Sequence, residues 1–154
     1  MNLISKKFKI ATYISLFYLL LSQTVYAQLS IEQAHIRLLP PVVKNTAAFF
    51  NITNTSEQDI HLVSAHSNIS ELVEFHTHVM KGNIMSMVQL PKLVIPAKET
   101  ITLNSGGIHL MFLNLHSPLK AKQAVQFELI DNAGKRYSFT ANVKAENSHS
   151  HHHH

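Results

Sequence analysis

Residues 75–113 read FHTHVMKGNIMSMVQLPKLVIPAKETITLNSGGIHLMFL, and this stretch decides both the fold class and the candidate site. It consists of short runs in which apolar and polar residues alternate, as they do in β-strands with one buried face. Turn-forming residues separate the runs at 81–83, at Pro96 and at 105–107. The stretch therefore predicts short strands joined by tight turns.

The same pattern continues through the chain on both sides of this stretch. Candidate strands cover residues 30–37, 46–54, 59–66, 71–80, 83–90, 92–95, 99–104, 108–115, 123–131 and 135–143. So many short strands, with no room for helical crossovers between parallel strands, predict an all-β chain folded as a β-sandwich or Greek-key barrel. No internal repeat or linker divides it, so we expect a single domain.

The N-terminal segment has the composition of a signal peptide. Residues 1–27 combine a lysine-rich start with an apolar run, residues 10–21, that is short for a membrane span. Val25 and Ala27 supply the small side chains that a signal peptidase reads. We expect cleavage after Ala27 and export to the periplasm; the alternative is an uncleaved N-terminal anchor.

The mature chain then divides into a folded domain, residues 28–145, and a polar tail, residues 146–154, that we expect to be disordered. The tail is either a native metal-binding extension or an appended tag. If it is native, its imidazoles would bind Cu(II) or another divalent ion. The residues concerned are His149, His151, His152, His153 and His154.

Charge and cysteine content exclude several classes of function. The leader holds three of the 13 basic residues and none of the 9 acidic ones, which leaves the mature chain at a formal charge of +1. That balance gives no basic surface for nucleic acid or an anionic membrane. The chain has no cysteine, so it forms no disulfide, accepts no lipid at the cleavage site and cannot build a blue-copper centre.

Two histidines and two methionines follow the spacing H-x10-M-x21-H-x-M, namely His76, Met87, His109 and Met111. Imidazole nitrogen and thioether sulfur are ligands that Cu(I) prefers, whereas the set offers neither the oxygen cage of calcium nor the thiolates of structural zinc. Side chains alternate along a strand, so the apolar residues define the core face and leave these four on the other. The predicted core-facing residues are Val73, Phe75, Val79, Ile84, Val88, Leu90, Ile108, Leu110 and Phe112.

The first two strands of the stretch should form a hairpin with one of two registers. A loop at 81–82 places His76 opposite Met87, and a loop at 82–83 places His78 opposite Met87. Both registers keep histidine and methionine on one face. His78 and Met85 share that face and are candidates for secondary or alternate ligands.

With these residues placed, the chain resembles the PCu(A)C family of periplasmic copper chaperones, whose hallmark is the same four-residue spacing. The resemblance covers nearly the whole mature chain. It includes AAFFNITNTS (47–56), ELVEFHTHV (71–79), LVIPA (93–97), GGIHLMFLNL (106–115) and PLKAKQAVQFEL (118–129). Two positions depart from the family: Lys98 replaces a common Gly, and Val88 replaces a usual Arg.

The resemblance implies a cupredoxin-like β-sandwich with an exposed Cu(I) site of two histidines and two methionines. It also implies a monomer that carries copper to the CuA centre of cytochrome c oxidase, alongside a Sco-type thiol protein. The alternative is a copper-sequestering or resistance protein that binds several ions with help from the histidine tail. No G-x-S-x-G, cysteine nucleophile or H-E-x-x-H motif indicates an enzyme.

Overall fold

The computed structural model describes residues 28–145 and contains the ten strands that the sequence predicts, each end within one residue of its expected position. The strands are β1 (Leu29–Arg37), β2 (Thr46–Asn54), β3 (Ile60–Ser67), β4 (Ser70–Lys81), β5 (Ile84–Gln89), β6 (Leu93–Ile95), β7 (Thr100–Leu103), β8 (His109–Leu115), β9 (Ala124–Asp131) and β10 (Arg136–Lys144). The predicted signal peptide and histidine tail lie outside the described residues. Across residues 28–145, no helix has the length and apolar character needed to cross a membrane.

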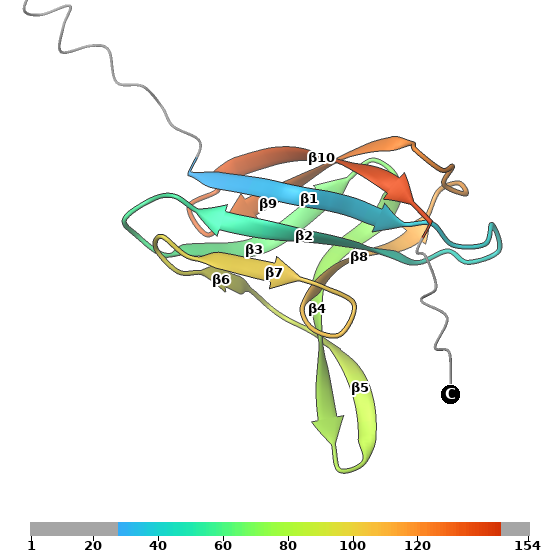
Figure 1. Cartoon of the computed structure of the whole chain (residues 1–154), viewed down its shortest axis with the longest axis horizontal. Helices are drawn as coiled ribbons and strands as arrows, with labels where there is room; N and C mark the ends of the chain where they lie inside the picture. Colours follow the sequence, from blue (N-terminus) through green and yellow to red (C-terminus); the bar gives the residue numbers. More distant parts are fainter. Residues whose placement is uncertain (1–27, 146–154) are drawn as a thin grey trace, which may run out of the picture.

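The strands form one continuous sheet that folds back on itself (Figure 1). Its order is β5-β4-β8-β2-β1-β10-β9-β3-β6, with β7 on a second stretch of β2. A single pairing of Ala65 with Val73 joins β3 to β4 and closes seven strands into a flattened ring. The β1–β10 pair is parallel and the other pairs are antiparallel. The predicted all-β fold is therefore confirmed.

The core fills the space inside this ring with the alternate, inward-facing residues of each strand. Phe127 lies at its centre, with ring centroids 5.7 Å from Phe50 and 6.2 Å from Phe112, the latter edge-on. Leu110 and Leu129 are fully buried in the same cluster. Each such side chain contributes roughly 1.5–3 kcal/mol through burial, so strand β8 is anchored by the side chains that alternate with His109 and Met111.

The hairpin of β4 and β5 projects beyond the rest of the sheet (Figure 1). Its loop is Gly82–Asn83, where Gly82 has φ +63°, and His78 therefore lies opposite Met87, the second of the two registers considered. The prediction that Ile84 faces the core is wrong, because its side chain is 70% exposed. Val79 and Val88, predicted on the same face, are half-buried but do not pack against the core either. Alternation does place Ile84 and Met85 on opposite faces of the hairpin, but the projecting tip has no core beneath it.

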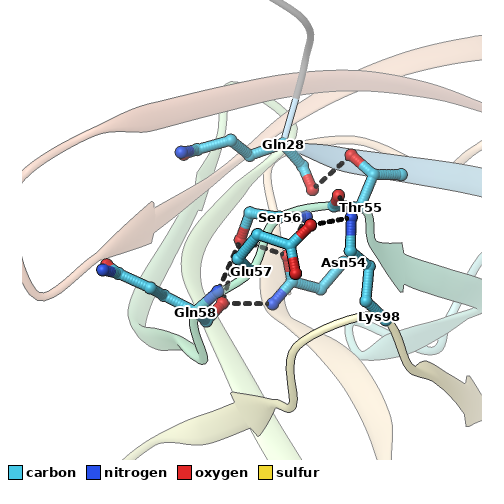
Figure 2. A network of polar contacts seen from close by, with 7 residues as sticks. All are labelled: Gln28, Asn54, Thr55, Ser56, Glu57, Gln58 and Lys98. Atoms are coloured by element: carbon cyan, nitrogen blue, oxygen red, sulfur yellow. Dashed lines mark hydrogen bonds and ion pairs between the residues drawn. The ribbon is translucent and has the colours of Figure 1, made fainter.

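A network of hydrogen bonds lies at the C-terminal end of β2, around Asn54 (Figure 2). The buried Asn54 side chain donates to the carbonyl oxygens of Gln58 and Ile95, at 2.7 and 3.0 Å, and accepts from the backbone N–H and hydroxyl of Ser56. Lys98, at φ +60°, donates to the Thr55 carbonyl. A lysine thus occupies a left-handed position that favours glycine, and its side chain binds the neighbouring loop.

Candidate metal centre

Strand pairing brings the predicted ligands onto one face of three adjacent strands, β5, β4 and β8. His76 lies directly opposite His109, and Glu74 directly opposite Met111, in the β4–β8 pair. His78 lies opposite Met87 in the β4–β5 pair. Because residues two apart on a strand share a face, all of these side chains stand on the same side of the sheet.

His109 is the best-defined donor of the group. Its Nδ1 lies 2.9 Å from the Gly107 carbonyl oxygen. A carbonyl only accepts, so Nδ1 carries the proton and Nε2 of the neutral ring keeps its lone pair. That Nε2 lies 3.3 Å from the sulfur of Met87. Two electron-pair donors therefore face each other, an arrangement that a cation between them would stabilise.

The spacing of these two atoms suits a shared metal ion. For zinc, which like Cu(I) has a filled d shell, bonds of about 2.0 Å to nitrogen and 2.3 Å to sulfur at a tetrahedral angle hold the two donors about 3.5 Å apart. The observed nitrogen–sulfur distance of 3.3 Å is close to that value. The His109–Met87 pair therefore fits a bound ion with little movement of either side chain.

The electrostatics of the site keep His109 neutral. Burial lowers the pKa of this imidazole below its ordinary value of 6.5, and the side chain is only 3% exposed. The hydrogen bond to Gly107 acts in the opposite direction. Electrostatic repulsion from His78, His76 and Arg37 lowers the pKa of His109 further. A neutral imidazole is the form that binds metal.

An open pocket of about 250 Å³ lies against this cluster. Its walls include Met87, His109 and Met111 together with His78, whose ring centroid is 5.3 Å from that of His109. His76 does not line the pocket. The structure thus places three of the four predicted ligands at the pocket, and His78 supplies an imidazole beside them.

His76 instead forms a pair with Glu74. Its Nε2 donates to the Glu74 carboxylate at 2.8 Å, and its buried Nδ1 has no hydrogen-bond partner among the described residues. A histidine with one nitrogen held by a carboxylate and the other free is the usual arrangement of a metal ligand with its supporting group. His78 likewise has a buried Nδ1 with no partner in the described part of the chain.

Two of these features escaped sequence analysis. Glu74 stands two residues before His76, and the alternation that grouped the histidines should also have placed this carboxylate on their face. Arg37 lines the pocket from β1, with its guanidinium 5.0 Å from the centre of the Phe49 ring. No local pattern joins Arg37 to the motif, because only the sheet order brings β2 beside β8 and β1 next to β2.

The remaining predicted residues lie further out. Met85 is 64% exposed near the tip of the hairpin and does not line the pocket. The tail histidines are outside the described residues. Among residues 28–145, no three His, Cys, Asp or Glu side chains are arranged to hold a metal ion by themselves; the cluster described above differs in including two thioethers.

The closed all-β sheet is the cupredoxin-like fold of PCu(A)C domains. The structure matches the copper-bound PCuAC domain from PmoF2 with a TM-score of 0.67 and 15% identity, covering 80% of this chain and 97% of that one. It matches the Cu(I) form of DR1885 from Deinococcus radiodurans with a TM-score of 0.62 and 30% identity, covering 82% and 83%. The resemblance recognised in the sequence is confirmed.

The chain belongs to the family described as putative lipoprotein LpqE-like, whose model matches residues 29–143. A curated relative, the putative lipoprotein Lxx21020 of Leifsonia xyli subsp. xyli, is 31% identical over 100 residues, which is 64% of this chain. The match spans 60% of that relative's length.

Proposed function

We propose that this protein binds one Cu(I) ion at the open pocket beside β4, β5 and β8 and hands it on to another protein. His109, Met87 and Met111 would supply three donors and His76 the fourth, with His78 as the neighbouring imidazole. The observation that carries the proposal is the His109–Met87 pair, in which a lone-pair nitrogen and a thioether sulfur lie 3.3 Å apart beside an open pocket.

The donor set favours the monovalent ion. Two imidazoles and two thioethers are all neutral ligands, so the loaded site carries only the charge of the metal ion. Soft sulfur ligands also select Cu(I) over the harder divalent ions. The copper-bound forms of the PmoF2 domain and of DR1885 support the same cargo. Binding and release exchange ligands only; no bond in a substrate is made or broken.

The delivery route follows from the resemblance to the family. We propose an exported protein that supplies copper to the CuA centre of cytochrome c oxidase, together with a Sco-type thiol protein. The lipoprotein descriptions of the family and of the Leifsonia relative support a place in the cell envelope. Transfer from the Cu(I)-loaded protein to an isolated CuA domain, followed by the visible absorption of that centre, tests this route.

A competition titration tests the binding site. The parent and a Met87→Leu variant are titrated with Cu(I) against a chromogenic chelator, and we expect the variant to lose affinity at least tenfold, which is about 1.4 kcal/mol. Leucine preserves the apolar volume, so the loss would report the sulfur. Ile84→Leu, on the other face of the same strand, is the matched control and should bind like the parent. Equal affinity in Met87→Leu would remove Met87 from the site.

A further inference from the structure

The methionines of this chain are distributed in an unusual way. Of five in the sequence, the four beyond Met1 are Met80, Met85, Met87 and Met111. The pairing of β4 with β5 and β8 puts all four on the face that carries the histidines. The proposed copper site uses two of them, and Met80 and Met85 remain without a role.

These two methionines form a cross-strand pair. Met80 lies directly opposite Met85. The Leu90 N–H donates to the Phe75 carbonyl, so that pair is hydrogen-bonded, and the antiparallel alternation makes Met80–Met85 a non-hydrogen-bonded pair. Side chains approach most closely at such positions, with Cβ atoms roughly 4.5–5.5 Å apart, so two flexible thioethers can close on one ion.

Packing does not explain the pair. Met80 is 61% exposed and Met85 is 64% exposed, on a hairpin that projects beyond the sheet (Figure 1). Methionine inside a protein usually fills gaps in the core, and here no core lies beneath the side chains. Soft sulfur presented to solvent is instead suited to a soft ion that enters from outside.

The pair continues the row of donors outward from the proposed site. Met80–Met85 stands two residues beyond His78–Met87 along the hairpin, a step of about 7 Å. Met87 contacts the Nε2 of His109 at 3.3 Å. Thioether and imidazole donors thus run from the exposed tip to the buried histidine without leaving one face.

We propose that Met80 and Met85 form a second, outer Cu(I) site through which copper enters and leaves the inner one. This inference rests on the proposed function, because the outer site has a purpose only if the inner one binds copper. Two thioethers leave coordination positions open for a donor from a partner protein or for Met87. Movement of the ion between the sites exchanges one sulfur ligand for another; copper stays monovalent and no proton or electron is transferred.

The experiment compares the full-length parent with a Met80→Leu/Met85→Leu double variant. Cu(I) is added under anaerobic conditions while the methionine methyl resonances are followed by NMR and the bound copper is measured with a competing chelator. We expect the first equivalent to shift the Met87 and Met111 methyl signals and the second to shift those of Met80 and Met85. The double variant should bind the first equivalent with parental affinity, lose the second, and transfer copper to the chelator at least fivefold more slowly.

Ile84→Leu is the control, because Ile84 is as exposed as Met85 but points to the opposite face of the same tip. It should keep both equivalents and the parental transfer rate. The inference is overturned if the Met80 and Met85 signals do not move with copper, or if the double variant transfers copper as fast as the parent. Failure of the proposed function is distinct: the first equivalent would then leave the Met87 and Met111 signals unchanged in the parent.

Discussion

His109 shows how one buried side chain couples the stability of this protein to pH. Its pKa is lowered from 6.5, chiefly by burial. Below pH 6.5 the unfolded chain therefore takes up a proton that the folded chain refuses. The stabilising contribution is complete above pH 6.5 and is lost as the pH falls through the lowered folded value. The metal-free protein should thus unfold more easily in mild acid.

Chemical denaturation of the metal-free protein at about pH 7.5 and about pH 5 measures this dependence. We expect the parent to lose free energy of unfolding between the two conditions and a His109→Gln variant to lose less. His116→Gln is the control, because His116 is exposed on the loop after β8. This variant should lose as much free energy of unfolding between the two pH values as the parent does. If His109→Gln loses as much free energy of unfolding as the parent, another group causes the pH dependence of stability.

Among the elements, the β4–β5 hairpin depends on its loop to present His78 and Met87. Gly82 has φ +63°, and a Cβ built there would meet nothing within 4 Å. Gly82→Ala would therefore be strained by its backbone conformation alone, at about 1–2 kcal/mol. We expect faster amide exchange in β5, by roughly 5–30-fold, and weaker Cu(I) binding. NMR-detected hydrogen exchange measures the first effect.

Gly106→Ala is the control for this substitution. Gly106 has no left-handed φ, and its nearest contact, the side-chain oxygen of Asn104 at 3.7 Å, is an ordinary one. We expect its amide exchange and copper affinity to remain within about twofold of the parent, equivalent to less than 0.5 kcal/mol. If both alanine variants behave alike, the loop of the hairpin does not control the site.

The elements also show how far the sequence predicts this molecule. All ten strands follow from alternation and turn residues, since both are local properties. The hairpin register was narrowed to two choices, and the conformation of the loop at Gly82 decides between them. The inward orientation predicted for Ile84 failed because alternation says which residues share a face but not whether a core lies beneath it. Alternation also placed the histidines and methionines on one face, but the two other neighbours of His109, Arg37 and Phe49, could not be predicted, because only the sheet order brings β1 and β2 close to it.

For the whole molecule, a mutation should be able to change folding stability without changing copper affinity, because the C-terminal end of β2, around Asn54, lies far from the pocket. Asn54 is five residues along the strand from Phe49, the nearest wall of the pocket on β2, which is roughly 16 Å. Asn54→Ala would leave the buried carbonyl of Ile95 without its donor and should lower the free energy of unfolding by about 2–3 kcal/mol. Gln58→Ala, which keeps the backbone carbonyl, should cost less than about 0.5 kcal/mol.

Copper should stabilise the parent and Asn54→Ala equally. A ligand that binds only the folded state at a thousand times its Kd adds about 4 kcal/mol, whatever the stability of the apoprotein. Denaturation with and without buffered Cu(I) should therefore give the same increment for both proteins. The Met87→Leu/Met111→Leu variant should lose most of that increment while it remains folded. If Met87→Leu/Met111→Leu is still stabilised by copper as much as the parent, copper binds elsewhere. If copper no longer stabilises Asn54→Ala, the site depends on the far end of the sheet.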